Sequence, residues 1–273
     1  MKSKYIFADV DGTLVNFEGK MPDSTADAIN AANANGHKII VCTGRARKQV
    51  YPFLRNSKAI DGMITSSGSV LEKHGKVFSR ECFPDAAKNF IVSLLRKRGI
   101  AYAMLSEDGS VSEQYCVNGI AEVFRKSGMA PEKAREIFGD MIIKDRPEES
   151  TDAEKIVYYD ADISNEEMAA LIGPEFNIDE YSFGRYRKTS GEITLSNINK
   201  ATAIEKYIRY CGADLSDVIA VGDGDNDRKM IKYAPIGIAM GNSSPSVLAA
   251  ADYVTDDINN DGFAKALIHF GLI

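Results

Sequence analysis

Short apolar runs alternate with helical patterns at the start of the sequence. The runs Lys4–Asp9 and Lys38–Cys42 flank a helical pattern over Ser24–Asn35, which Gly36 ends. Because both runs are almost continuously apolar, they are typical of strands that are covered on both faces in a parallel sheet. This order predicts an α/β fold with a parallel sheet.

The C-terminal part of the sequence repeats this order. A helical pattern over Lys200–Tyr210 precedes the apolar run Val218–Val221, and a second pattern near Asp227–Tyr233 precedes the run Ile236–Met240. Ser244-Pro245 is then typical of a helix start, with serine as the N-cap and proline at the first helical position. Both ends of the chain are therefore predicted to build one parallel sheet.

The middle of the chain has elements of its own. These are helices near Asp85–Arg98 and Asn118–Lys126, and strands near Ile100–Leu105, Glu154–Tyr159 and Phe176–Phe183. Polar stretches containing proline or glycine, at 81–85 and 187–191, flank this region. We therefore predict a core of residues 1–82 and 189–273, interrupted by an inserted α/β domain at 83–188.

Composition excludes several classes of protein. The net charge of -6 lacks the basic bias of nucleic-acid binders. The four cysteines lie far apart and form no C-x-x-C pair, which is typical of reduced thiols in the cytosol. No apolar run approaches the roughly 20 residues of a membrane helix, and no export signal is visible. We expect a cytoplasmic protein that binds neither nucleic acid nor membranes; the sequence indicates no oligomeric state.

Two carboxylates, Asp9 and Asp11, follow the first predicted strand directly. Open α/β sheets bind ligands at the carboxyl ends of their strands. Residues two apart leave a strand on the same side, so both carboxylates can face one small volume, where a bound cation would relieve their repulsion. A simple turn at Asp11-Gly12 remains the alternative. A calcium-binding EF-hand loop is excluded, because its twelfth position is Lys20 instead of glutamate.

A second acidic cluster, Gly222–Asp227, follows a predicted strand in the same sense. Parallel strands end at one edge of a sheet, so this cluster and Asp9 and Asp11 are expected to converge. Together they offer the oxygen ligands that Mg²⁺ prefers. The alternative is a solvated acidic loop that caps the next helix. A dinucleotide-binding fingerprint is excluded, because the third glycine of G-x-G-x-x-G would fall on Asp227.

Two further groups are suited to phosphate. Thr43-Gly44-Arg45 ends the second predicted strand, where a hydroxyl and backbone amides can hold phosphate oxygens. Lys200 opens a helix, where its ammonium would neutralise charge on a transferring phosphoryl group. Taken alone, each is more often an ordinary surface residue.

The stretch Asp257–Gly262 matches the first six positions of an EF-hand loop. Its twelfth position is Ile268, and no helix leads into it. We predict a turn into the last helix.

In chain order, Asp9-x-Asp11-Gly12-Thr13, Thr43-Gly44-Arg45, Lys200 and Gly222-Asp223-x-x-Asn226-Asp227 resemble the four motifs of the haloacid dehalogenase (HAD) superfamily. The placement and length of the insertion resemble the type C2B cap of its Cof-like sugar-phosphatase branch. The tail is also similar to that branch, in the segments Ile238–Asn242, Ala251–Thr255 and Asp261-Gly262. The resemblance implies a Rossmann-like, doubly wound parallel-sheet core with an inserted α/β cap.

The resemblance also implies a role for each motif. Asp9 would be the nucleophile that forms an aspartyl-phosphate, and Asp11 would protonate the leaving alcohol and then activate water. Mg²⁺ would be held by the Asp9 side chain, the Asp11 carbonyl and Asp223, with Asp227 as a further or outer ligand. The residues expected at the phosphate are Thr43, Gly44, Arg45, Lys200 and Asn226.

Two stretches depart from the family pattern. Ser67-Gly68-Ser69 stands where members commonly carry Asn-Gly-Ala, and Asn197–Ala201 stands where they carry Gly-x-x-Lys-Gly. Both stretches lie near the predicted substrate entrance. The resemblance therefore transfers no particular sugar preference.

The predicted function is Mg²⁺-dependent hydrolysis of a small phosphorylated metabolite. The alternatives are a sugar phosphomutase or phosphotransferase on the same fold, and a non-catalytic phosphometabolite-binding protein. Arg185, Arg187 and Lys188 either contact an anionic leaving group or form a solvated basic stretch, of which the second is the simpler interpretation. Tyr158 and Tyr181 are expected to be packing residues.

Overall fold

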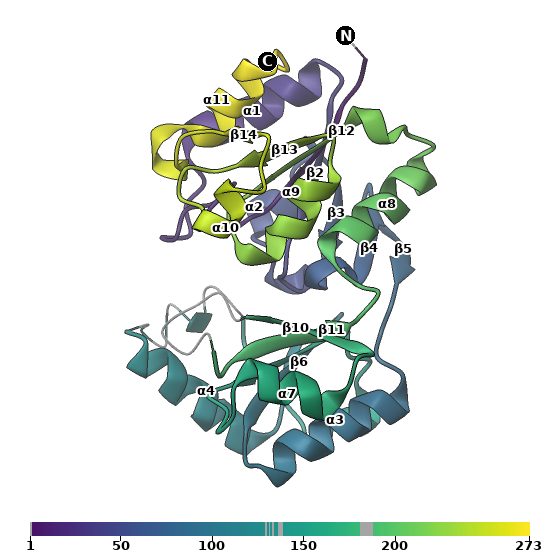
Figure 1. The fold of residues 1–273 in the computed structure, drawn as a ribbon, viewed down its shortest axis with the longest axis vertical. Coiled ribbons are helices and arrows are strands. Elements are labelled where there is room, and N and C mark those ends of the chain that lie inside the picture. Colours follow the sequence, from purple (N-terminus) through teal and green to yellow (C-terminus); the bar gives the residue numbers. More distant parts are fainter. Residues whose placement is uncertain (1, 129, 131, 133, 136–138, 181–187) are drawn as a thin grey trace. The chain divides into compact units, whose positions relative to one another are not determined.

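The computed structural model describes residues 2–128, 130, 132, 134–135, 139–180 and 188–273. Its contacts divide the chain into two compact units, coloured along the sequence in Figure 1. The first unit comprises Met1–Gly44, Tyr51–Ser79 and Asn199–Ile273, and the second comprises Arg45–Val50 and Arg80–Ile198. Among the described residues, no helix combines the length and the apolar character needed to span a bilayer.

The first unit is built on an eight-stranded sheet of order β14-β13-β12-β1-β2-β3-β4-β5. Its strands are β1 (Tyr5–Ala8), β2 (Lys38–Cys42), β3 (Ile60–Thr65), β4 (Val70–Lys73), β5 (Lys76–Arg80), β12 (Val218–Gly222), β13 (Ile236–Ala239) and β14 (Tyr253–Val254). The strands from β14 to β3 run parallel, and β4 is antiparallel to β3. The chain winds outward from β1 in both directions, which confirms the predicted doubly wound core.

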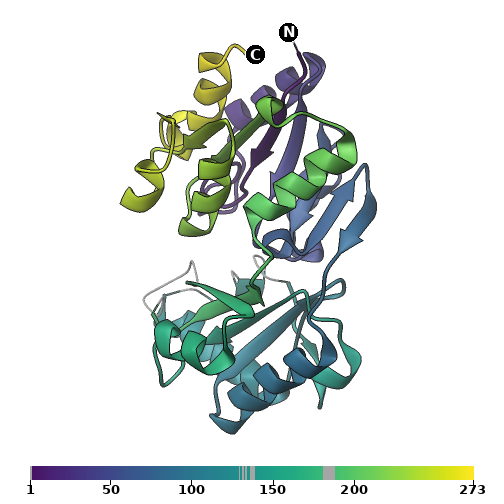
Figure 2. The same ribbon diagram turned by 45° about the vertical axis from the view of Figure 1, so that its right-hand side comes forward.

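Helices cover both faces of this sheet. They are α1 (Asp23–Ala34), α2 (Pro52–Arg55), α8 (Lys200–Cys211), α9 (Arg228–Tyr233), α10 (Pro245–Leu248) and α11 (Gly262–His269). Figure 2 shows α8 and α9 on one face and α1 and α11 on the other. Phe7 of β1 packs edge-on against Tyr207 of α8, with ring centroids 5.5 Å apart. Such side chains come from alternate strand positions, so the continuous apolar runs serve both faces.

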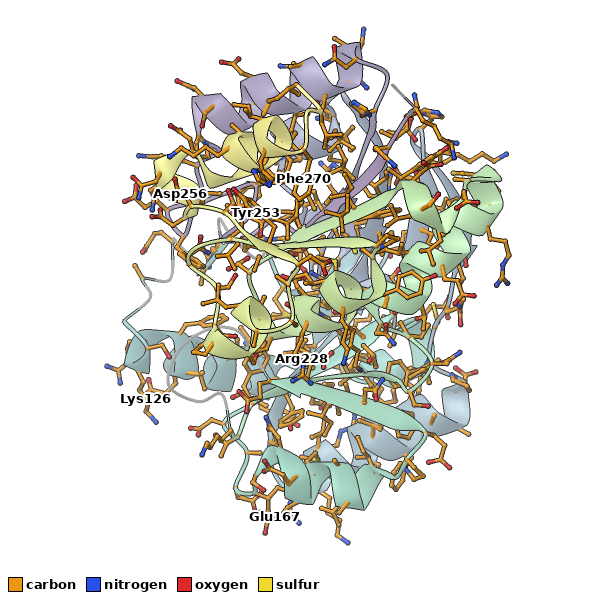
Figure 3. All side chains as sticks on the ribbon, turned by 45° about the horizontal axis from the view of Figure 1, so that its top comes forward. Lys126, Glu167, Arg228, Tyr253, Asp256 and Phe270 are labelled. Atoms are coloured by element: carbon orange, nitrogen blue, oxygen red, sulfur yellow. The ribbon has the colours of Figure 1, made fainter. Side chains whose placement is uncertain are left out.

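The last helix is fixed to the edge strand by aromatic contacts. Tyr253 of β14 stacks on His269 with ring centroids 4.0 Å apart and meets Phe270 edge-on at 5.5 Å. Tyr253 and Phe270 are labelled in Figure 3. The predicted turn at Asp257–Gly262 is confirmed: a 3₁₀ turn at Ile258–Asn260 leads into α11.

The second unit has a six-stranded sheet of order β10-β11-β9-β6-β7-β8. Its strands are β6 (Ala101–Ser106), β7 (Gly109–Ser112), β8 (Ile142–Ile143), β9 (Lys155–Tyr159), β10 (Phe176–Glu180) and β11 (Gly191–Leu195). Its helices are α3 (Asp85–Lys97), α4 (Gln114–Lys126), α6 (Pro147–Ser150) and α7 (Asn165–Ile172). Tyr158 is fully buried and donates a hydrogen bond to Asn165 of α7 at 2.6 Å. Tyr158 is thus a packing residue, as predicted.

Two segments belong to the second unit although the sequence pattern did not predict it. β11 follows the predicted boundary at residues 188 and 189, yet it pairs with both β9 and β10. The segment Arg45–Val50 also groups there, and its Gln49 donates a hydrogen bond to Ser110 of β7 at 2.9 Å. The predicted strand Phe176–Phe183 is observed as β10; its last residues, with Tyr181, Arg185 and Arg187, lie outside the described residues.

Candidate active site

Asp9 and Asp223 lie side by side at the carboxyl edge of the parallel sheet. β1 and β12 pair so that Ala8 is opposite Val221, and the Asp9 amide donates to the Val221 carbonyl at 3.0 Å. Both aspartates are only 7–8% exposed. The strand register therefore brings the two predicted acidic clusters together.

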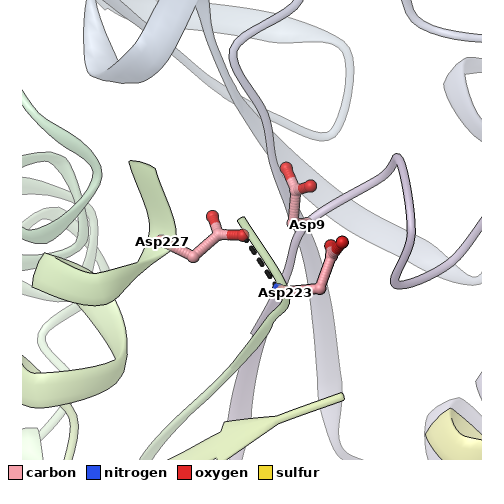
Figure 4. Close-up of side chains that lie close together, drawn as sticks. All are labelled: Asp9, Asp223 and Asp227. Atoms are coloured by element: carbon pink, nitrogen blue, oxygen red, sulfur yellow. Dashed lines mark hydrogen bonds between the residues drawn. The ribbon is translucent and has the colours of Figure 1, made fainter. Parts of the chain in front are cut away.

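Asp227 completes a cluster of three carboxylates, which Figure 4 shows. One oxygen of each of Asp9, Asp223 and Asp227 lies within 4.8 Å of the others. Asp227 Oδ2 accepts the backbone N–H groups of Asp223 and Gly224, both at 3.0 Å. Asp227 is thus turned back onto its own loop.

Lys200 binds two of these carboxylates. Its Nζ donates to Asp9 Oδ1 at 2.6 Å and to Asp227 Oδ1 at 2.5 Å, and the residue is 1% exposed. Asn199 is the N-cap of α8, and its side chain accepts from the backbone N–H groups of Ala201 and Thr202. Because the cap fixes the start of the helix at Lys200, it positions the Lys200 ammonium at the cluster.

The cluster is short of positive charge, because one ammonium faces three buried carboxylates. Burial and the Asp227 charge raise the pKa of Asp9 to about 7. Burial and the Asp9 and Asp227 charges raise the pKa of Asp223 to about 8. Burial disfavours the Lys200 ammonium, but the charges of Asp227 and Asp9 outweigh burial and hold its pKa above the ordinary value. With all four groups ionised, two negative charges stay uncompensated.

This donor set fits a divalent cation. Carboxylate oxygens are the ligands that Mg²⁺ takes in proteins, and a +2 ion balances the two excess charges. Asp227 is the least available of the three, because its oxygens already accept three hydrogen bonds, two of them at Oδ2, whereas each oxygen of Asp223 accepts one. Asp9 and Asp223 are therefore the side chains best placed to bind such an ion.

The loop after β1 carries Asp11 and is tightly folded. The Val15 amide donates to the Val10 carbonyl at 2.8 Å, and the Gly12 amide donates to the Val15 carbonyl at 2.7 Å. Asp11 is partly exposed, beyond the buried Asp9. The structure thus keeps Asp11 on the loop that leaves the sheet edge.

The predicted phosphate-binding stretch starts at the same edge. Val41 of β2 is opposite Ala8, so Thr43 follows β2 at the same sheet edge as Asp9. The Thr43 amide donates to the Ile64 carbonyl at 2.8 Å, and Thr43 is 1% exposed. Arg45 is buried and donates to the Gln49 carbonyl at 3.2 Å.

Asn226 is the last of the residues predicted at the phosphate. It lies half-buried in the 3₁₀ turn Asp225–Asp227, with its Oδ1 against Gly224. The turn that carries Asn226 therefore also carries Asp227 of the acidic cluster.

Two contacts to Asp223 were not predicted. Thr13 Oγ1 donates to Asp223 Oδ1 at 2.9 Å, and Asn242 Nδ2 donates to Asp223 Oδ2 at 3.1 Å. Asn242 follows β13, which pairs in parallel with β12. Its position after a parallel strand was the signal that could have placed it at this edge of the sheet.

The fold and these residues place the protein among phosphatase-type hydrolases with an α/β core. A family model described as haloacid dehalogenase-like hydrolase matches residues 6–267. The chain therefore belongs to the haloacid dehalogenase-like hydrolases.

Full-length relatives carry phosphatase names. The 5-amino-6-(5-phospho-D-ribitylamino)uracil phosphatase YcsE of Bacillus subtilis is 29% identical over 274 residues, covering 98% of this chain and 96% of the relative. The solved structure of a HAD subclass IIB sugar phosphatase is similar with a TM-score of 0.82 and 28% identity, over 99% of this chain and 100% of that one. A HAD phosphatase from Bacteroides thetaiotaomicron gives a TM-score of 0.81 at 28% identity, over 99% and 96%. These findings confirm the predicted superfamily and fold class.

Proposed function

We propose that this protein is a Mg²⁺-dependent phosphatase that hydrolyses a small phosphorylated metabolite, a sugar phosphate or similar phosphomonoester, through an aspartyl-phosphate on Asp9. The observation that carries the proposal is the buried cluster in which Lys200 contacts Asp9 at 2.6 Å and Asp227 at 2.5 Å beside Asp223. In this cluster the proposed nucleophile, Asp9, lies next to a fixed cation, the Lys200 ammonium, which supports the proposal.

Asp9, Asp223 and the Asp11 carbonyl would hold the metal. When bound, Mg²⁺ supplies the positive charge that lets a phosphate dianion approach ionised carboxylates. Asp227 would act by orienting Lys200 and the Asp223 backbone, since its Oδ1 accepts from the Lys200 ammonium and its Oδ2 accepts the Asp223 N–H.

In the first step an Asp9 oxygen attacks phosphorus, and the bond from phosphorus to the leaving alcohol breaks as Asp11 gives its proton to the departing oxygen. In the second step Asp11 takes a proton from water, which attacks phosphorus and releases phosphate and Asp9. Lys200 and the Thr43 stretch would hold the phosphoryl oxygens, supported by Gly44, Arg45 and Asn226. Positioning and positive charge suffice, because the transition state of phosphoryl transfer is loose.

The substrate class follows from the relatives by analogy. The substrate that YcsE is named for is a ribityl phosphate, and the subclass IIB structure is named a sugar phosphatase. Ribityl phosphates and sugar phosphates are both phosphate esters of polyhydroxylated chains. We extend this class to the present chain, with residues 83–188 as the substrate-selecting domain. The four cysteines are free, which supports a reducing cytoplasmic compartment.

Asp9→Asn tests the proposal. Phosphate release from an aryl phosphate and a panel of sugar phosphates should fall by about 10³-fold or more, because an amide is a poor nucleophile. Asp225→Asn is the matched control. Asp225 is exposed in the second acidic cluster and accepts hydrogen bonds from Ser244 and Ser246, which an amide oxygen also accepts.

The same assay with EDTA tests metal dependence, and analysis of the products separates hydrolysis from transfer to a second sugar hydroxyl. Undiminished turnover by Asp9→Asn would sink the mechanism. Saturable ligand binding without turnover would favour the non-catalytic alternative.

A further inference from the structure

The C-terminal tail resembles that of the Cof-like branch, but the proposed reaction steps involve none of its residues. One residue of this tail, Asn242, reaches the acidic cluster. Its Nδ2 donates to Asp223 Oδ2 at 3.1 Å and to the Gly12 carbonyl at 3.0 Å. Its Oδ1 accepts the Ile258 N–H at 3.1 Å. Both protons of the amide and its oxygen are used, so the amide orientation is fixed by its partners.

These contacts hold Asp223 from both sides. Asn242 donates to one carboxylate oxygen, and Thr13 donates to the other at 2.9 Å. Each oxygen accepts one such hydrogen bond, which leaves each with a further lone pair for a cation. Both donors stabilise the ionised form of the carboxylate, which is the form that binds metal.

Asn242 also ties the cluster to the end of the chain. The Gly241 amide donates to the Asp256 carbonyl at 3.1 Å, and Ser24 Oγ donates to Asp261 at 2.6 Å. Together with the bond from Ile258 to Asn242, these contacts anchor the segment 256–261 at the carboxyl edge of the sheet. The tail is therefore a support for the loop that carries Gly12 and for Asp223.

We propose that Asn242 is a positioning residue for the metal site: it holds the Asp223 carboxylate in one orientation and joins it to the Gly12 loop. This inference rests on the proposed Mg²⁺ dependence. Hydrogen-bonding partners of metal-binding carboxylates commonly change metal affinity by about 10- to 100-fold when they are removed. A change of this size is expected at Asn242.

The test is calorimetric titration of the metal-stripped, full-length protein with Mg²⁺, which needs no substrate. Asn242→Ala and Asn242→Leu should each raise the Mg²⁺ dissociation constant by about 10- to 100-fold. Leucine has the same branched shape as asparagine, so Asn242→Leu removes the hydrogen bonds without leaving a cavity, whereas Asn242→Ala does both. Asn259→Ala is the control: its Oδ1 accepts an exposed hydrogen bond from Asn16, away from the Asp223 carboxylate, and Mg²⁺ affinity should stay within about twofold of wild type.

If Asn242 only stabilised the fold, its variants would melt at a lower temperature in EDTA but would bind Mg²⁺ with the wild-type dissociation constant. Wild-type affinity in both Asn242 variants would therefore overturn the inference, whatever their stability. Absence of Mg²⁺ binding by the wild-type protein would instead contradict the proposed function. In activity assays the variants should need more Mg²⁺ for the half-maximal rate.

Discussion

At the scale of single residues, Gly12 shows how closely the two motifs at the sheet edge fit together. Its φ of +87° lies in the left-handed region that disfavours side chains. A Cβ atom built on Gly12 would also lie 2.1 Å from Asp223 Oδ2, which is far inside van der Waals contact. The glycine is therefore required both by the turn and by the neighbouring carboxylate.

Gly12→Ala should cost stability and activity together. The strained φ costs about 1–2 kcal/mol, and displacement of Asp223 should lower kcat/KM by roughly 10²-fold, because misplacing a catalytic group by about 1 Å has this effect. Gly36→Ala is the matched control: Gly36 also has a φ of +85°, but among the described residues beyond its chain neighbours no atom lies within 4 Å of the added Cβ. It should cost similar stability in urea unfolding and leave kcat/KM unchanged. Equal kcat/KM in both variants would refute the steric argument.

At the scale of elements, the start of α8 decides where the buried cation lies. Asn199 caps the helix by accepting the amides of Ala201 and Thr202 at 3.0 and 3.1 Å, and Thr202 Oγ1 accepts the Asn199 amide at 3.1 Å. This reciprocal capping box fixes the first turn. Lys200 is the first residue of that turn, so the cap and the cation of the acidic cluster share one backbone segment.

Asn199→Ala should therefore affect both folding and catalysis. Loss of the cap should lower the free energy of unfolding by about 1 kcal/mol and reduce kcat, because the turn that holds Lys200 frays. Ser164→Ala removes the equivalent capping box of α7 in the second unit, where Ser164 accepts the Glu167 amide. Urea unfolding should show a similar loss for both variants, and only Asn199→Ala should slow phosphate release. An equal loss of activity in Ser164→Ala would contradict the specific link between the α8 cap and Lys200.

At the scale of the whole molecule, the acidic cluster links folding to pH and metal. Asp9 and Asp223 have pKa values raised to about 7 and about 8, against about 3.9 in an unfolded chain. Between these limits the folded state binds more protons than the unfolded state. The resulting stability is fully present below about pH 4 and is lost as the pH rises through 7 to 8.

Without metal, the protein should become less stable as the pH rises. Urea unfolding in EDTA should show a fall of at least about 1 kcal/mol in the free energy of unfolding between pH 5 and 8. Saturating Mg²⁺ should remove most of this fall, because a cation replaces the protons. Asp223→Asn should flatten the pH dependence in EDTA. A wild-type profile with no fall, or one that Asp223→Asn leaves unaltered, would contradict the charge argument.

The sequence by itself determined the parallel sheet and the residues at its carboxyl edge. Apolar runs over β1, β2 and β12 are local patterns, and each ends at a motif, so these patterns alone place Asp9, Thr43 and Asp223 at one edge. Strands that lack a continuous apolar run cannot be predicted from this pattern. β7 (Gly109–Ser112) and β11 (Gly191–Leu195) contain polar or alternating residues, and β11 begins in a polar stretch that is typical of a linker.

Only the tertiary structure decided how the site is assembled. That Asp227 turns toward Lys200 and its own loop, and that Asn242 reaches Asp223, depends on the register of neighbouring strands and on the rotamers of packed side chains. The raised pKa values of Asp9 and Asp223 likewise arise from burial and mutual repulsion. Local patterns specify which residues reach an edge, whereas hydrogen-bond partners and burial are properties of the folded chain.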